Sequence, residues 1–255
     1  MLRHRVIPAL LLSEGRLVKT RRFKDPKYVG DPINSIRIFN DKEVDELLVL
    51  DIGASKKGSG PDFETLESLV GECFMPLCYG GGITTMDQAA RVFDLGVEKV
   101  SFQTAAMSNL KLISDVAKRF GSQSVVVSVD VKRNWRNAPR LYMSSQGRKQ
   151  KANWLDFITS ATDAGAGEIV LNAVDRDGEM AGYDLELIAV ASNAVSVPVV
   201  ALGGAGGLPH FKQAISAGAS AVAAGAFFVF HGPHRAVLIT YPAYSELEHL
   251  LGGVA

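Results

Sequence analysis

The segment Pro76-Leu-Cys-Tyr-Gly-Gly-Gly82 has a counterpart in Pro198-Val-Val-Ala-Leu-Gly-Gly204. A second pair follows each of them, because Leu95-Gly-Val-Glu-Lys-Val-Ser-Phe102 matches Ala217-Gly-Ala-Ser-Ala-Val-Ala-Ala224. Both pairs are separated by 122 residues, which is close to half of the 255-residue chain. A self-match of this kind indicates two homologous halves, each with four strand-helix units, joined in one barrel.

Short apolar runs alternate with amphipathic stretches along the whole chain, and most of the runs lack polar alternation. Such runs are typical of parallel strands that are covered on both faces. The predicted strands are Val6–Leu12, Leu47–Ile52, Met75–Tyr79, Lys99–Phe102, Ser124–Asp130, Glu168–Asn172, Val197–Leu202 and Ala221–Ala224. Helices are predicted over Pro32–Val44, Asp62–Cys73, Thr84–Leu95, Asn109–Phe120, Trp154–Ala164, Asp184–Asn193 and Pro209–Ala217. We expect one domain over residues 1–255, an α/β fold of the (β/α)8 TIM-barrel type with a two-fold half-barrel repeat; an open doubly wound sheet is the alternative.

Composition excludes several classes of function. The 27 basic residues balance the 27 acidic ones, so no net charge favours nucleic acid or a membrane surface. The two cysteines, Cys73 and Cys78, fit neither a disulfide framework nor a metal site, which favours buried thiols in the cytoplasm. The five histidines show no metal-ligand spacing, and the run Val6–Leu12 is interpreted as a buried strand and not as a signal peptide. We expect no metal and no cofactor.

Glycine clusters end one strand in each half. Gly80, Gly81 and Gly82 follow the first, and Gly203, Gly204, Gly206 and Gly207 follow the second. The next unit opens a short helix with small residues, Gln103-Thr104-Ala105 and Gly225-Ala226. Free backbone N–H groups in such a setting favour phosphate. Two of these arrangements across one rim predict a ligand with a phosphate at each end; the alternative is that the glycines only make tight turns.

Several longer motifs carry a resemblance to a known family. They are Asp51-Ile-Gly-Ala-Ser55, Tyr79-Gly-Gly-Gly-Ile83, Gly121-Ser-Gln-Ser-Val-Val-Val127, Asp175-Arg-Asp-Gly178, Gly182-Tyr-Asp184 and Gly203-Gly-Ala-Gly206. Together they resemble the cyclase subunit of imidazole glycerol phosphate synthase (HisF type) over nearly the whole chain. The resemblance implies a subunit that closes the imidazole ring of a bis-phosphorylated nucleotide with ammonia from a separate glutaminase (HisH-type) subunit. It also implies substrate contacts for Lys19, in a mobile first loop, and for Asp51, Asp177 and Gly178, beside the two phosphate sites.

The resemblance implies a charged ring where ammonia enters the barrel. The matching positions here are Arg5, Glu46, Lys99 and Glu168, each at or just before the start of an apolar strand. Charges at such places need partners, and alternating signs let the four satisfy one another. The gate is the favoured interpretation; a purely structural cluster of salt bridges is the alternative.

The resemblance further implies two catalytic aspartates, on the first and fifth strands, that act as general acid and base. Asp130 ends the fifth strand and matches one of them, whereas the other position is Leu11, which can neither accept nor donate a proton. Milder departures are Gln103 in place of an asparagine and Ala226 in place of a serine. Efficient cyclisation is therefore not expected.

The stretch from Lys132 to Lys151 contains seven basic residues and no acidic one. We expect it to form a hairpin over the mouth, either as a solvated loop or as a lid that attracts an anionic substrate.

Three hypotheses follow. The first is a diverged second copy of the HisF type that serves the amidination of a surface-polysaccharide (lipopolysaccharide) sugar together with a third, ATP-using amidotransferase. The second is a genuine cyclase of histidine biosynthesis that tolerates Leu11. The third is a non-catalytic barrel that binds and activates a glutaminase.

Overall fold

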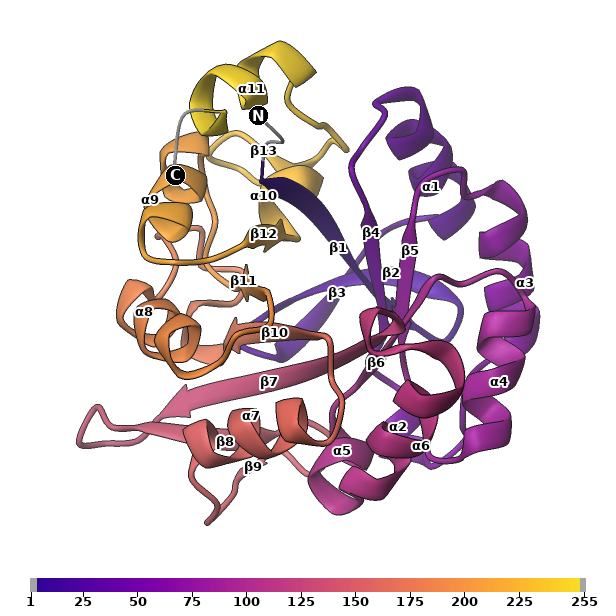
Figure 1. Cartoon of the computed structure of the whole chain (residues 1–255). Coiled ribbons are helices and arrows are strands. Elements are labelled where there is room, and N and C mark those ends of the chain that lie inside the picture. The colour runs from indigo at the N-terminus through magenta and orange to yellow at the C-terminus, as the bar shows by residue number, and fades with distance from the viewer. Residues whose placement is uncertain (1–3, 253–255) are drawn as a thin grey trace.

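The computed structural model describes residues 4–252, and in this range eight parallel strands close into a barrel. They are β1 (Arg5–Ser13), β4 (Leu47–Asp51), β5 (Leu77–Gly80), β6 (Lys99–Phe102), β7 (Val125–Arg133), β10 (Glu168–Ala173), β11 (Val199–Leu202) and β12 (Ala221–Ala224). Each pairs with the next, and β12 pairs with β1 in the register Ala221 to Arg5, which closes the ring. The predicted (β/α)8 barrel is confirmed, with its strands at the centre of Figure 1.

Helices surround the barrel in Figure 1 and join successive strands. The longer ones are α1 (Pro32–Asp41), α3 (Phe63–Glu72), α4 (Met86–Asp94), α6 (Leu110–Phe120), α7 (Trp154–Asp163), α8 (Leu185–Ala194), α9 (Leu208–Ser216) and α11 (Tyr244–Leu251). Shorter ones are α2 (Ala54–Lys57), α5 (Thr104–Ser108), α10 (Ala226–Val229) and the 3-10 turns η1 (Ser122–Ser124) and η2 (Val174–Arg176). The predicted cap of α1 is present, since the Asp31 carboxylate accepts a hydrogen bond from the backbone N–H of Asn34 and Pro32 opens the helix.

The first helix is shorter than predicted. It ends at Asp41 and not at Val44, and Glu43 has a left-handed backbone with a φ of 51°. This turn brings Asp45 to the start of β1, where its carboxylate accepts a hydrogen bond from the Val6 N–H at 2.8 Å. Helical continuation would carry Asp45 away from this contact, so tertiary contacts decide where α1 ends.

Two apolar clusters explain why the strands lack polar alternation. Along β1, Val6, Leu10 and Leu12 pack in the larger cluster, which includes helix residues such as Phe39. Ile7 and Ala9 belong to a second cluster that contains only strand residues. Because successive strand residues point to opposite faces, the second cluster fills the inside of the barrel. The inside is thus apolar between its two ends.

Two hairpins rise from the carboxyl ends of the strands. The first, β2 (Arg16–Arg21) with β3 (Lys24–Gly30), is antiparallel and continues from β1. The first loop, which the resemblance implies is mobile, contains this paired hairpin over residues 16–30, and its mobility stays a prediction. The second joins the end of β7 to β8 (Pro139–Met143) and β9 (Arg148–Lys149), as expected for the basic stretch. Its tip projects beyond the ring of helices in Figure 1. A small pair, β13 (Phe230–His231) and β14 (Ala236–Val237), precedes α11.

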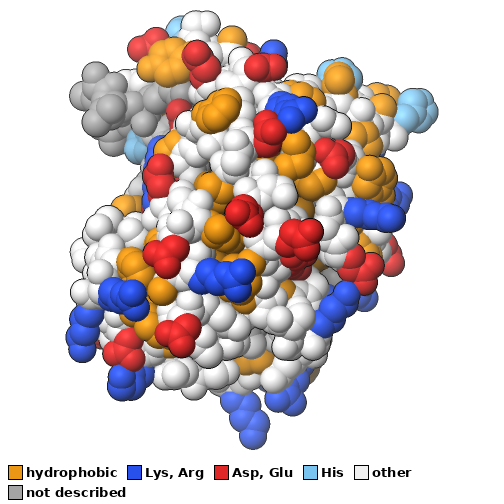
Figure 2. Space-filling model, turned by 90° about the vertical axis from the view of Figure 1, so that its right-hand side faces the viewer, with side chains coloured by type: hydrophobic (Ala, Val, Ile, Leu, Met, Phe, Trp, Pro, Cys, Tyr) orange, Lys and Arg blue, Asp and Glu red, His pale blue; other side chains and the backbone are white. Residues whose placement is uncertain are grey.

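The surface carries charges of both signs. Figure 2, turned toward the side with α1, α3 and α4, shows acidic and basic side chains interspersed with single hydrophobic ones. Cys78 is buried as expected, whereas Cys73 is only partly buried. Within residues 4–252, no helix combines the length and the apolar character needed to cross a membrane.

Candidate functional site

A cavity of about 420 Å³ opens at the carboxyl ends of the strands. In parallel barrels this is the end where loops build binding sites. The predicted first-half residues Gly81, Gly82, Gln103 and Thr104 line it, and so do Lys19, Asp51 and Asp177. Several hydroxyl-bearing residues complete the wall: Thr20, Ser55, Ser101, Ser128, Ser144 and Ser145. The cavity is therefore mixed in character, with many hydrogen-bonding groups above an apolar floor.

Asp130 lies in this cavity on β7 and is 6% exposed; the strand continues to Arg133, three residues past the predicted end. Its carboxylate accepts hydrogen bonds from Gln103 Nε2 at 2.9 Å and from Asn172 Nδ2 at 3.2 Å. Burial raises the pKa of Asp130 to about 7, since these donors, which favour the charged form, only partly offset the cost of desolvation. A carboxyl with such a pKa exchanges protons readily near neutral pH, as a general acid or base must.

Leu11 lines the same cavity from β1. The other two acids in the wall are already engaged. Asp51 Oδ1 accepts hydrogen bonds from the N–H groups of Gly53 and Ala54 at 2.8 and 3.1 Å. The Asp177 carboxylate binds Lys19 Nζ at 2.9 Å and the hydroxyl of Thr20 at 2.8 Å. Of the carboxylates described in this wall, Asp130 is thus the one not committed to an ion pair or to a helix start.

The second half of the rim is closed by the β2–β3 hairpin. The buried ion pair of Lys19 with Asp177 joins β2 to the segment after β10. The Arg22 N–H donates to the Asp177 carbonyl at 2.9 Å, and Arg21 pairs with Glu179. Beside them, a Cβ added to Gly225 would lie 2.9 Å from Lys19 Nζ. Lys19 therefore occupies the space next to the predicted second cradle.

The second-half glycines make close backbone contacts. A Cβ on Gly204, whose φ is +120°, would lie 2.2 Å from the Gly182 carbonyl oxygen. On Gly178 it would lie 2.4 Å from the Thr20 carbonyl oxygen, and on Gly203 2.8 Å from that of Ala173. These glycines and Ala226 are absent from the cavity wall described above. The structure accounts for the glycines by packing, and phosphate binding at either cradle stays a prediction.

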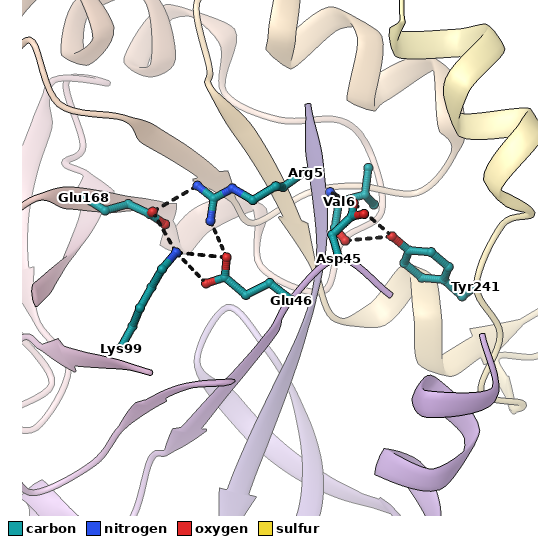
Figure 3. A network of polar contacts seen from close by, with 7 residues as sticks. All are labelled: Arg5, Val6, Asp45, Glu46, Lys99, Glu168 and Tyr241. Atoms are coloured by element: carbon teal, nitrogen blue, oxygen red, sulfur yellow. Dashed lines mark hydrogen bonds and ion pairs between the residues drawn. The ribbon is translucent and has the colours of Figure 1, made fainter. Parts of the chain in front are cut away.

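The four charges expected at the other end of the barrel meet in one ring, as Figure 3 shows. Arg5 binds Glu46 and, at 2.9 Å, Glu168. Lys99 Nζ lies 3.0 Å from Glu46 and 3.1 Å from Glu168. Both glutamates are buried, and each is held by two cations, so the ring satisfies itself as the sequence predicts.

The basic side chains of the 132–151 hairpin do not line the cavity; its turn does, through Tyr142 and residues 144–147. Arg133 instead pairs with Asp184 and Glu186. Lys132 lies over the Tyr142 ring, 5.1 Å from its centroid. The lid interpretation therefore rests on the position of the hairpin and not on direct contact between these cations and the cavity.

Sequence reasoning missed several residues of the site. Asn172 lies beside Asp130, one residue before the end of β10, and it could have been found because the predicted strand ends at this residue. Ser144 and Tyr142 reach the cavity only because the hairpin folds back, and nothing in the sequence pattern indicates where its turn lies. Phe23, at the tip of the β2–β3 hairpin, meets the Tyr142 ring edge-on with centroids 6.1 Å apart.

Comparisons with known proteins identify the family of this chain. The family model described as "Histidine biosynthesis protein" matches residues 5–233. A Pseudomonas aeruginosa protein provisionally named imidazole glycerol phosphate synthase subunit HisF2 is 51% identical over 249 residues, which cover 97% of this chain and 99% of that protein. A Vibrio vulnificus protein provisionally named subunit HisF3 is 47% identical over 256 residues, covering 98% and 97%. The imidazole glycerol phosphate synthase subunit HisF of a Nocardioides species is 40% identical over 233 residues, covering 89% and 90%. The chain therefore belongs to the histidine biosynthesis protein family, among its HisF-type members.

Proposed function

We propose that this protein is the synthase subunit of a glutamine amidotransferase system, a HisF-type second copy that has lost cyclase chemistry. One observation carries the proposal: Leu11 lines the cavity where the resemblance implies an acid, and the remaining acids Asp51 and Asp177 are engaged elsewhere. Of the three carboxylates described in the cavity wall, Asp130 is the one left to accept or donate a proton, and it cannot serve both faces of a substrate at once.

The proposal also concerns which molecule accepts the ammonia. A reaction that needs one proton transfer in this cavity, or none, suits a one-acid site better than ring closure does. The amidination of an acetamido sugar of a bacterial surface polysaccharide is such a use, with activation by a separate ATP-using amidotransferase in the cytoplasm. The barrel then acts mainly as a conduit and a scaffold.

Delivery of ammonia would begin at the ring of Arg5, Glu46, Lys99 and Glu168, where a HisH-type glutaminase would dock. The position of Phe74 supports docking of the glutaminase at this end of the barrel. Phe74 lies in the loop between α3 and β5, at the end of the barrel where the strands begin, and it is 85% exposed. A large exposed aromatic side chain at that end is an apt anchor for a partner protein.

The test is to mix the protein with a candidate glutaminase and measure glutamine hydrolysis. We expect hydrolysis to rise several-fold, and Phe74→Ala to abolish most of that rise. Trp135→Ala is the matched control, because Trp135 is equally exposed, at 84%, but lies on the hairpin at the opposite end. If both variants activate the glutaminase as well as the unaltered chain does, Phe74 is not part of the interface.

A genuine cyclase remains the second candidate, favoured by the proton-exchanging Asp130 and by the open first half of the cavity. Incubation with the bis-phosphorylated nucleotide and an ammonium salt separates the two. Turnover similar to that of a relative with both aspartates would refute the loss of cyclase chemistry. Activation of the glutaminase without binding of any phosphorylated ligand would instead support the third hypothesis, a non-catalytic scaffold.

A further inference from the structure

Gln103 makes hydrogen bonds with both ends of its amide. Its Nε2 donates to Asp130 Oδ2 at 2.9 Å and to the Tyr142 carbonyl at 3.0 Å. Its Oε1 accepts from the hydroxyl of Ser144 at 3.1 Å and from that of Thr104 at 3.0 Å. One side chain from the end of β6 thus joins Asp130 on β7 to the hairpin that covers the mouth.

The length of the side chain matters for this bridge. An asparagine at position 103 is one methylene shorter, so its amide would retreat by about 1.5 Å. From there the amide nitrogen would lie roughly 4 Å from one or both of its acceptors, beyond hydrogen-bonding distance. The family that this chain resembles has an asparagine at this position. Gln103 differs from it in the length of the side chain, which is the property that the bridge requires.

We propose that Gln103 is a positioning residue that couples the docking of the β8–β9 hairpin turn to the ionisation of Asp130. When the turn is docked, the Tyr142 carbonyl and the Ser144 hydroxyl fix the amide so that an N–H points at the carboxylate. When the turn lifts away, that N–H is no longer held in place. Loss of that N–H removes a donor from the charged form of Asp130, and it favours the protonated form as long as the carboxyl stays buried, since burial is the largest cause of its raised pKa.

Other groups also act on Asp130. Asn172 Nδ2 donates to the other carboxylate oxygen, and the negative charge of Asp177 opposes ionisation. The titratable and charged residues that face the cavity from the surrounding elements are Lys19, Asp51, Lys56, Tyr142 and Asp177. Lys19 and Asp177 form an ion pair with each other, and Tyr142 belongs to the hairpin itself. The Ser144 hydroxyl, from the turn, also favours the charged form of Asp130 and lowers its pKa, so the docked turn acts on the carboxylate both directly and through Gln103.

The inference concerns the same cavity as the proposed function, but its test needs no turnover, so the two can fail separately. The chain is labelled with ¹³C at the aspartate carboxyl carbon, and the Asp130 signal is assigned by its absence in Asp130→Asn. Its titration midpoint is measured by NMR, and hydrogen exchange of residues 140–151 by mass spectrometry. Gln103→Leu removes the bridge at similar volume. Gln103→Asn shortens it and serves as the second variant should the leucine variant fold poorly.

We expect both variants to raise the midpoint of Asp130 by about one unit and to speed exchange of the hairpin several-fold. Gln150→Ala is the matched control, because Gln150 lies on the same hairpin but outside the cavity wall, and its side-chain amide makes only a long 3.4 Å contact with the Arg148 carbonyl. It should change neither readout. An unchanged midpoint in both Gln103 variants would overturn the proposal. A raised midpoint with hairpin exchange as slow as in the unaltered chain would also overturn it, since ionisation would then not be coupled to docking.

Discussion

Leu11 and Asp130 line one cavity from β1 and β7, strands that lie four places apart in the closed ring of eight. A substrate between them meets a carboxyl on one side and an isobutyl group on the other. The asymmetry is a property of the folded chain, because 118 intervening residues separate the two in sequence. A single substitution at Leu11 can reverse this asymmetry.

Restoring the acid should restore part of the cyclase chemistry. Leu11→Asp is expected to raise ammonia-dependent turnover of the bis-phosphorylated nucleotide at least tenfold, since a positioned acid–base group contributes about 10²–10⁴-fold. The measurement is imidazole glycerol phosphate formed with an ammonium salt. Leu50→Asp is the control, because Leu50 pairs with Leu11 on β4 and lines the same cavity. Equal gains in both variants would mean that the position of the acid is immaterial.

Asp130 should make stability depend on pH. Its folded pKa of about 7 lies above the ordinary value of 3.8, so the folded chain binds more protons than the unfolded chain between these values. The stabilisation that protonated Asp130 gives to the folded state is fully present below about pH 3.8, and it is lost as the pH rises to about 7. Between pH 5 and pH 8 we expect a loss on the order of 2 kcal/mol that Asp130→Asn does not show. Urea unfolding of both chains at the two pH values measures it, and parallel pH curves would contradict the raised pKa.

The charged ring should contribute more to stability than an exposed ion pair does. Glu46→Gln leaves Arg5 and Lys99 sharing one carboxylate in a partly buried site, which should cost about 2 kcal/mol of unfolding free energy. Glu72→Gln breaks the exposed pair with Arg37 and should cost clearly less, because solvent screens that pair. Chemical denaturation of the two variants decides the point. If Glu46→Gln costs no more than Glu72→Gln does, the ring is dispensable to the fold, and the ammonia gate becomes the better interpretation of its four charges.

The glycine cluster after β11 offers a test of backbone packing. Gly204→Ala should lower the unfolding free energy by about 2 kcal/mol or more, because its Cβ would lie 2.2 Å from the Gly182 carbonyl oxygen and its φ is +120°. Gly207→Ala should cost less than about 1 kcal/mol, since Gly207 is extended and its Cβ would be 3.6 Å from the nearest atom. Thermal or urea unfolding distinguishes them. Similar costs at the two sites would show that the segment around Gly182 moves aside freely.

The sequence alone determined the barrel, its two-fold repeat and the end of the barrel at which the candidate site is expected. Apolar runs without polar alternation must be buried on both faces, and the repeat of Pro76–Gly82 at Pro198–Gly204 requires equivalent places in one sheet. The family resemblance identified Leu11 as the partner position of Asp130, and both lie toward one rim because strand ends in a parallel barrel share that rim. The resemblance also identified the four residues of the charged ring at the start of the strands.

Only the tertiary structure decided how the rim is filled. Lys19 reaches Asp177 across 158 residues, and Gln103 reaches the Tyr142 carbonyl across 39, through hairpins whose paths depend on what they pack against. The closure of the second cradle and the bridge to Asp130 are products of these contacts. Local sequence patterns report backbone preference and burial, but they carry no information about which distant side chain meets a given carboxylate.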